Sequence, residues 1–402
     1  MLLRNVAGSL LVVTVILTAG LMTPSPAASA ASSGVVAWGY NGDGQLGIGT
    51  TSKSDTAVAV KDLGTVTAVA AGGYHSLALL KNGTVMAWGF NKHGQLGNDA
   101  TGNDGAVPAT VRKLSQVIAI SAGTFDSLAL LSNGTVMAWG ENVYGDLGDG
   151  TTTGSDVPVA VCAVGATAPC SAGDGNALSG VIAISAGGSH SLALLRNGTV
   201  VAWGENDHGE LGDGTATTMG ADVPVVVRGL SAVTAISAGG NHNLALLANG
   251  AVKAWGSNDH GQLGTDSTDP SSDVVVPVKS LKDVTAVSAG AQHSLALLAN
   301  GTVRAWGLNN DGQLGDGTIG KESKAARPVT TLSGVTAISA GADYSLALLD
   351  DGTVMAWGSN EWGALGIATT QSTKSDMPES VPGLSAVSAI SAGAFHSLAE
   401  EG

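Results

Sequence analysis

Short apolar runs recur along the chain and are separated by glycine-rich polar segments. Val66 to Ala70, Leu77 to Leu80 and Val85 to Trp88 are rich in β-branched or apolar residues, and they are too brief for helices. Asn82-Gly83 separates the second run from the third. This pair is preferred in two-residue hairpin turns, because both residues tolerate a positive φ. The pattern therefore predicts short antiparallel strands joined by hairpins.

The same pattern repeats seven times, and each copy carries a Trp-Gly pair. The tryptophans of these pairs are Trp38, Trp88, Trp139, Trp203, Trp255, Trp306 and Trp357. An Ala-Gly-x-x-(His)-Ser-Leu-Ala marker also recurs seven times, at Gly72, Gly123, Gly187, Gly239, Gly290, Gly341 and Gly393. A period near fifty residues indicates a solenoid or a propeller. A further run containing Val-Pro-Val, as at Val223 to Val225, supplies a strand whose proline suits a sheet edge.

Four strands in each of seven repeats predict an all-β, seven-bladed β-propeller over residues 31–402. Radial repetition of this kind hides most sheet edges. After the first thirty residues the chain opens with a lone last strand, Val35 to Trp38, and it ends with an incomplete blade at His396 to Ala399. We therefore expect the N-terminal strand to complete the C-terminal blade as its fourth strand and to close the ring.

One repeat shows a family resemblance. It reads Ala-Gly-Ala-Gln-His-Ser-Leu-Ala-Leu over 289–297, Asn-Gly-Thr-Val-Arg-Ala-Trp-Gly over 300–307, and Asn-Asn-Asp-Gly-Gln-Leu-Gly over 309–315. This unit resembles the repeat of the regulator of chromosome condensation (RCC1-type) family, and the resemblance extends over residues 34 to 399. It implies the same propeller. The paired glycines and the Tyr-Trp signature of kelch repeats are absent. Propellers host many activities, so the resemblance alone does not assign a function.

Composition excludes several classes of partner. The chain has 402 residues, of which 44% are apolar and only 12% are charged, and its formal net charge is −15. The apolar content is too high for a disordered chain and is ample for a core. Lys and Arg are not clustered in any window, so we expect no binding to nucleic acid. Anionic membranes are disfavoured by the same negative charge.

The first thirty residues differ from the rest of the chain. Val6 to Met22 is almost entirely apolar, Thr23 to Pro26 ends this run, and Ala28-Ser29-Ala30 is a small-x-small cleavage site. Residues 1–30 thus read as a secretory signal peptide. The alternative is an uncleaved membrane anchor, because the apolar run approaches the length of a span. The flanking residues favour cleavage, and no second long apolar run follows. We expect a secreted, extracellular protein of bacterial origin, with no membrane insertion after cleavage.

Cys162 and Cys170 are the only cysteines, and an oxidising compartment permits their pairing. A zinc site would need two more ligands, which residues 163–169 do not offer. We therefore predict a disulfide between them. It lies in an insertion at about residues 160–180, which accounts for the longest spacing between Trp-Gly pairs. We expect this insertion to lengthen a first-to-second-strand turn on one rim of the propeller.

Five repeats carry a histidine after Ala-Gly-x-x, namely His75, His190, His242, His293 and His396. Asp126 and Tyr344 replace it in the other two repeats. A group that recurs in blade after blade is more often structural than catalytic, and we expect it to tie its strand to a neighbouring loop. The chain has no Gly-x-Ser-x-Gly elbow and no His-Glu-x-x-His motif, and its Gly-Gln-Leu-Gly loops lack a following lysine. We predict no enzyme activity and no cofactor. Weak calcium binding stays open, although no EF-hand loop is present.

Aromatic residues are expected to gather on one rim, opposite the insertion. Strand polarity places the Ala-Gly-x-x loops and the loops after Trp-Gly on the same rim. The residue before the repeated histidine position is aromatic in three consecutive blades, and two more aromatics follow Trp-Gly. The predicted partner-binding residues are Tyr40, Tyr74, Phe90, Phe125 and Phe395. Clustered exposed aromatics are typical of interface anchors. The alternative is that they fill gaps between loops.

A second resemblance concerns the same positions. The secreted bacterial β-lactamase inhibitory protein of the propeller type is similar in its Ala-Gly-x-x-His-Ser-Leu-Ala-Leu and Ala-Trp-Gly elements, and aromatics before its histidines build the inhibitory face. Tyr74, Phe125 and Phe395 match this pattern. The positions that do not match are Ser189, Asn241, Gln292 and Asp343.

These observations favour a monomeric, non-enzymatic binding or scaffold propeller whose partner is a protein or a cell-envelope surface. One alternative is a secreted inhibitor of an extracellular hydrolase. Another is a guanine-nucleotide exchange factor for a small GTPase, the activity that the first family is known for. Exchange would require a cytosolic location, which the signal peptide contradicts.

Overall fold

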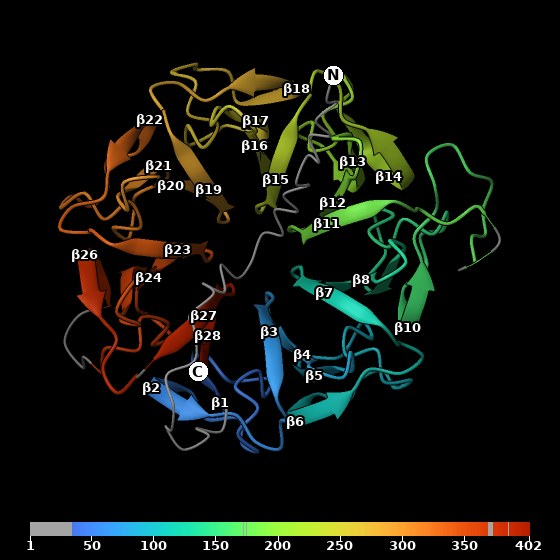
Figure 1. Ribbon diagram of the computed structural model, residues 1–402, viewed down its shortest axis with the longest axis horizontal. Coiled ribbons are helices and arrows are strands. Elements are labelled where there is room, and N and C mark those ends of the chain that lie inside the picture. Colours follow the sequence, from blue (N-terminus) through green and yellow to red (C-terminus); the bar gives the residue numbers. More distant parts are fainter. Residues whose placement is uncertain (1–33, 172, 174, 369–372, 385) are drawn as a thin grey trace, which may run out of the picture.

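Seven antiparallel sheets of four strands each are arranged radially around one axis in a computed structural model of the chain (Figure 1). It describes residues 34–171, 173, 175–368, 373–384 and 386–402. The described part of the chain contains strands and turns and no helix. The predicted seven-bladed β-propeller is therefore confirmed. The predicted signal peptide, residues 1–30, lies outside the described residues. No helix among the described residues is long and apolar enough to cross a membrane.

The strands fall into four concentric layers. The innermost are β3 (Val66–Ala71), β7 (Val117–Ala122), β11 (Val181–Ala186), β15 (Val233–Ala238), β19 (Val284–Ala289), β23 (Val335–Ala340) and β27 (Val387–Ala392). The second layer holds β4 (His75–Leu80), β8 (Asp126–Leu131), β12 (His190–Leu195), β16 (His242–Leu247), β20 (His293–Leu298), β24 (Tyr344–Leu349) and β28 (His396–Glu401).

The third layer carries the Trp-Gly pairs. It holds β1 (Gly34–Gly39), β5 (Val85–Gly89), β9 (Val136–Gly140), β13 (Val200–Asn206), β17 (Val252–Ser257), β21 (Val303–Gly307) and β25 (Val354–Ser359). The outer layer holds β2 (Ser54–Ala59), β6 (Gly105–Thr110), β10 (Ser155–Ala160), β14 (Thr217–Val226), β18 (Ser271–Pro277), β22 (Ser323–Pro328) and β26 (Lys374–Ser380).

We predicted that the Trp-Gly strand is the fourth and last strand of its blade, and this prediction was wrong by one position. The Trp-Gly strand is the third of its sheet, and the strand with the Val-Pro-Val run lies outside it. Closure by the N-terminal strand is confirmed, because β1 pairs with β28 from Gly34 opposite Glu401 to Gly39 opposite His396. The N-terminus supplies a second strand as well, since β2 pairs with β1. Two strands from each end thus build the closing blade, in the order β2-β1-β28-β27.

The hydrophobic core lies between neighbouring blades. Leu77 and Leu79 of one blade pack with Ile120 and Trp139 of the next. All seven tryptophans of the Trp-Gly pairs are fully buried. Each donates its indole N–H to a loop carbonyl of the preceding blade, as Trp139 does to Gln95 at 2.8 Å. Each tryptophan therefore supplies a large buried area and a hydrogen bond at the seam between two blades.

The insertion after β10 connects two blades. Cys162 and Cys170 form the predicted disulfide, with their Cα atoms 5.3 Å apart. The insertion joins the outer strand β10 to the innermost strand β11, so its assignment to a turn between the first two strands of a blade was wrong. It extends outward beyond the circumference (Figure 1). The register of β10 and β11 places both of its ends away from the aromatic loops, as predicted.

Around the axis, the Ala-Gly-x-x loops approach one another so closely that only glycine fits. A Cβ on Gly72 would lie 2.6 Å from the carbonyl oxygen of Gly123 in the next blade. The same carbonyl accepts a hydrogen bond from the N–H of Gly73 at 2.9 Å. Equivalent bonds join five further pairs of neighbouring blades, donated by Thr124, Gly188, Gly240, Ala291 and Ala394. This close approach fixes the direction in which each loop leaves the axis.

Candidate partner-binding rim

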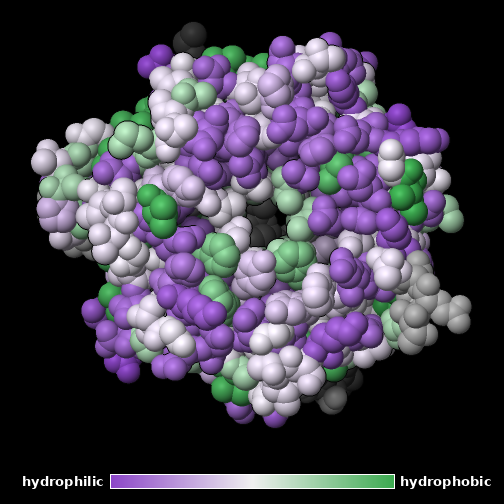
Figure 2. All heavy atoms as spheres, turned by 180° about the vertical axis from the view of Figure 1, so that it is seen from behind, coloured by the Kyte–Doolittle hydropathy of each residue, from purple (hydrophilic) through white to green (hydrophobic). Residues whose placement is uncertain are grey.

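The five predicted aromatic residues come together at one side of the axial opening. Phe395, Tyr74 and Phe125 immediately precede the second strand in three consecutive blades, and each is partly buried. Tyr40 and Phe90 follow β1 and β5 at the same end of these sheets. Figure 2 shows this face, on which hydrophobic side chains gather along one side of the central opening amid largely hydrophilic surroundings.

Tyr74 lies at the centre of these aromatics. Its ring stacks on Phe125 at a centroid distance of 5.5 Å with an interplanar angle of 4°. Tilted contacts join it to Phe395 at 5.6 Å and to Phe90 at 6.0 Å. Tyr40 meets Phe395 edge to face at 6.4 Å. These distances are typical of favourable aromatic pairs, so the rings form one continuous surface.

Trp362 extends this surface, and it was missed in the sequence. Its ring lies 5.0 Å from Tyr40 and 6.4 Å from Phe395, and 40% of its surface is exposed. Trp362 occupies the sixth position of a Trp-Gly-x-Asn-x-x-Gly loop, and this loop reaches across to the next blade. His93 holds the same position in another blade and contacts Phe125 of the next at 5.3 Å. Comparing this loop position with the aromatic residues of the next blade, and not of its own blade, would have predicted both contacts.

We call the seven residues together the aromatic arc. They are Trp362, Tyr40, Phe395, Tyr74, Phe90, Phe125 and His93. The arc spans the seams of four consecutive blades, from the loop after β25 to the second strand β8.

Charged groups mark both ends of the arc. Lys92 places its Nζ 5.4 Å from the Phe90 ring centre, a cation–π distance. Near the other end, partial burial and then the Asp43 carboxylate raise the pKa of the Tyr40 phenol, which stays neutral at physiological pH. His93 Nδ1 lies 3.4 Å from a carboxylate oxygen of Glu141 in the next blade. Beyond Glu141 the rim has no further ring contact among the described residues.

The remainder of the rim is polar and largely acidic. Glu141 and Glu205 replace the aromatic residue after Trp-Gly, and Ser189 and Asn241 replace the one before the second strand. Burial, followed by the nearby Glu210 carboxylate, raises the pKa of Glu205. A cavity of about 370 Å³ lies at the boundary, between His93, Glu141 and Asp156. The rim therefore offers a partner an apolar half and an acidic half, with a recess between them.

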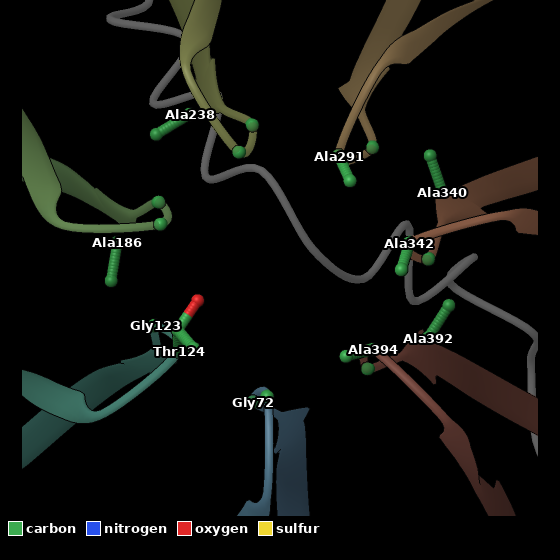
Figure 3. A pocket seen from close by; sticks show the side chains of 18 of the residues that line it. Gly72, Gly123, Thr124, Ala186, Ala238, Ala291, Ala340, Ala342, Ala392 and Ala394 are labelled. Atoms are coloured by element: carbon green, nitrogen blue, oxygen red, sulfur yellow. The ribbon is translucent and has the colours of Figure 1, made fainter. Parts of the chain in front are cut away.

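The axial opening itself is lined by small residues. Its cavity of about 140 Å³ is bounded by the seven Ala-Gly-x segments that precede the second strands. Figure 3 shows that alanine side chains and glycines surround it and that Thr124 directs its hydroxyl toward the axis. Among the described residues, those that line this opening are uncharged, and they present small side chains and backbone groups.

Below the rim, the repeated histidines form a buried belt across the seams. His75 Nε2 lies 2.8 Å from Ser127 Oγ in the next blade, and His396 lies equally close to Ser76. His242 and His293 contact serines in the same way, and His190 contacts Asn243. The predicted bond to a neighbouring loop was therefore wrong in its partner, because the histidine bonds to the equivalent strand of the next blade.

The belt fixes the protonation state of its histidines. Ser76 donates its only hydroxyl proton to the Gln45 carbonyl at 2.9 Å, so it must accept from the Nε2–H of His396. Burial lowers the pKa of His75, His242 and His396 to about 3. These rings remain neutral at physiological pH. They are sealed from solvent and tied to a serine, which suits a structural role.

Two seams have no histidine. In one of them Tyr344 takes its place, and its hydroxyl lies 2.9 Å from Ser397 Oγ of the next blade. The other seam has no such bond. Asp126 stands where the histidine would be, and neither its Oδ2 nor Ser191 Oγ in the next blade has a hydrogen-bond partner among the described residues. Burial and then the Asp146 carboxylate raise the pKa of Asp126 well above its ordinary value. The disulfide-bearing insertion joins the same two blades. Within the described residues, no group of three or more His, Cys, Asp or Glu side chains is placed to hold a metal ion.

Comparison with known proteins adds a family to this geometry. The model of the RCC1-like domain matches residues 25–296 and 165–401. The Ultraviolet-B receptor UVR8 of Arabidopsis thaliana is 28% identical over 365 residues, covering 87% of this chain and 78% of the receptor. The Probable E3 ubiquitin-protein ligase HERC6 of Homo sapiens is 32% identical over 294 residues, covering 71% of this chain. The matched part is only 27% of that ligase.

Solved structures share the fold. Human WBSCR16 superposes with a TM-score of 0.79 at 22% identity, covering 92% of this chain and 99% of that one. Prp20p from Saccharomyces cerevisiae, a structure described with its binding to Gsp1p and histones, gives a TM-score of 0.76 at 23% identity. It covers 92% of each chain. At these identities the likeness concerns the fold alone.

Proposed function

The chain belongs to the RCC1-like domain family, and on that premise we propose that it is a secreted, non-enzymatic protein-binding propeller whose partner contacts the aromatic arc. The partner is a protein or a cell-envelope surface. The observation that supports this most is the continuity of the arc, in which each of seven side chains contacts at least one other ring.

The burial of these rings suits an interface. Trp362 and His93 are exposed, and the other five rings of the arc are partly buried and contact neighbouring rings. Tyr and Trp anchors bury a large area at low cost in side-chain entropy. Three of the arc residues, Phe395, Tyr74 and Phe125, lie on the loops that make the close glycine contacts around the axis. A preorganised apolar surface of this kind loses little freedom when a partner binds.

The test begins with the exported protein as bait for the culture medium and for solubilised cell envelope. Once a partner is identified, its affinity is measured by calorimetry for Tyr74→Ala and Trp362→Ala. We expect each substitution to weaken binding by about 1 to 4 kcal/mol, the range of interface anchors. Asn241→Ala and Ser189→Ala, on the polar half of the same rim, are the matched controls. Equal affinity in all four variants would contradict the proposal.

Inhibition of an extracellular hydrolase is a second candidate. Tyr74, Phe125 and Phe395 precede the repeated belt position, where the propeller-type inhibitor carries the aromatics of its inhibitory face. A panel of secreted hydrolases, assayed with and without the protein, separates the two candidates. Inhibition that Tyr74→Ala abolishes would favour an inhibitor, and binding without inhibition would favour a scaffold. Stimulated nucleotide release from a small GTPase would instead support exchange activity.

A further inference from the structure

The seven outer strands share one edge geometry, which allows them to be compared position by position. Val60, just after β2, donates its N–H to the carbonyl of Val35 at 2.9 Å and so faces into the sheet. The equivalent donors are Val111, Val161, Val227, Val278, Val329 and Val381. Backbone groups alternate in direction along a strand, so the residues one and three positions earlier face away from the sheet.

Six of the seven outer strands carry a proline at one of these two outward positions. The prolines are Pro108, Pro158, Pro224, Pro277, Pro328 and Pro378. Proline has no N–H to offer to an approaching strand, and natural edge strands use it to prevent pairing. In β2 the two outward positions are Ala57 and Ala59. The closing blade thus has an outer edge with both of its outward donors intact.

The open part of this edge is short and well defined. Before it, the carbonyl of Asp55 accepts the N–H of Ala368 from the preceding blade at 3.1 Å. After it, the N–H of Lys61 donates to Gly47 at 3.1 Å. Between these points the outward backbone groups of Ala57 and Ala59 have no partner among the described residues. β2 lies on the circumference, where another strand can reach it (Figure 1).

A second copy of the chain fits this edge by its charges. When two β2 strands pair antiparallel with Ala57 opposite Ala59, all four outward N–H and carbonyl pairs are satisfied around a two-fold axis. The same register places Asp55 of one copy opposite Lys61 of the other, twice. Asp55 is half-exposed and Lys61 is exposed. In the single copy Asp55 pairs with Lys53 at 3.0 Å, so the dimer would add a second cation beside the same carboxylate. Opposite charges directly across two strands are favourable. With Ala57 opposite Ala57, Lys53 would instead face Lys61.

We propose that β2 is a self-association edge through which two copies of this chain form an antiparallel, two-fold dimer. The dimer replaces the monomer expected from the sequence. It does not depend on the aromatic arc. Because the paired strands run in opposite directions, the arcs of the two copies face opposite ways. In such a dimer each arc can bind a separate partner, and the two arcs cannot both contact one flat surface.

The test measures the oligomeric state of the exported protein by sedimentation, at concentrations from about 1 µM to about 1 mM. We expect a reversible dimer. Ala57→Pro installs the residue that four other outer strands carry at this position, so the fold should tolerate it. We expect it to raise the dimer dissociation constant at least ~10-fold. Pro108→Ala is the reciprocal variant, because it removes the proline that blocks the β6 edge, and we expect it to add association through β6 without weakening the β2 dimer.

Charge exchange identifies the register. Asp55→Lys and Lys61→Asp should each weaken the dimer, and the double variant should restore it, because the two charges face each other across the axis. Three outcomes would overturn the proposal. They are a monomer throughout the concentration range, a dimer that Ala57→Pro leaves intact, and a monomer that pairs β2 with an extended peptide of another protein.

Discussion

The buried belt and the aromatic arc use adjacent residues of the same loops, yet they differ in almost every respect. His75 of the belt is fully buried and recurs in most blades, whereas Tyr74 beside it is half-exposed and has aromatic counterparts in only two other blades. Side chains alternate in direction at the start of a strand, so one residue points into the seam and its neighbour toward solvent. Repetition therefore marks the framework, and departure from repetition marks the surface available for function.

We expect the largest loss of stability when the blade that closes the ring is disrupted. Deleting Gly34–Gly39 removes β1, so β28 loses a neighbour and β2 loses its attachment. We expect loss of cooperative thermal unfolding, or aggregation through the exposed edge of β28. Circular dichroism and size-exclusion chromatography measure this. Removing residues 31–33, after the predicted cleavage site, is the control, and equal melting of the two truncations would contradict the closure.

A smaller effect tests the close contacts around the axis. A Cβ on Gly187 would lie 2.5 Å from the carbonyl oxygen of Gly239 and 2.7 Å from the His190 ring. We expect Gly187→Ala to cost about 3 kcal/mol of unfolding free energy, because neither neighbour can move freely. Gly64→Ala serves as the control, since its Cβ would meet only Leu80 at 3.8 Å. Chemical denaturation of both variants decides the comparison, and similar losses would refute the close-packing argument.

The seam without a belt bond should be repairable. Asp126→His would supply an Nε2–H toward Ser191, and we expect it to stabilise the protein by about 1 to 2 kcal/mol at pH 8. The direction of this change follows from how Asp126 ionises in the folded and in the unfolded chain. The raised pKa of Asp126 means that the unfolded chain ionises first as pH rises from about 4, which destabilises the wild type.

The stability that the introduced histidine contributes should depend on pH in the opposite direction. Its pKa should be lowered by burial, as for His75, so its benefit should shrink as the pH falls below about 6.5. Unfolding free energies measured from pH 5 to 8 check this trend. A benefit that grows toward low pH would show that the histidine does not join the belt.

The smallest effect is expected in the arc. Trp362→Ala should lower the unfolding free energy by less than about 1 kcal/mol, because its ring is 40% exposed and its two ring contacts are T-shaped. Trp357→Ala, five residues earlier in the chain, removes a fully buried ring and should cost about 3 to 5 kcal/mol. Thermal melting of the pair tests the contrast, and a large loss at Trp362 would mean that the arc fills gaps between loops.

The sequence predicted the fold well because each blade repeats the same local signals. Glycine, the Asn-Gly turns and the apolar runs recur in phase, so errors in one repeat are corrected by the others. The strand order could not be read, because the loop after Trp-Gly is as long as a connection between blades. The contact of Trp362 with Tyr40 was missed for a related reason, since it joins residues from opposite ends of the chain.

Closure of the last blade by both ends of the chain has a consequence for the order of the sequence itself. Gly34 lies opposite Glu401, at the rim away from the aromatic arc. A short linker could join these residues, and new ends could open at an exposed hairpin such as Asn197-Gly198. The ring of inter-blade bonds has neither start nor finish, so such a circular permutant would retain every seam. The order of the blades around the ring, rather than the point at which the chain enters it, therefore defines this fold.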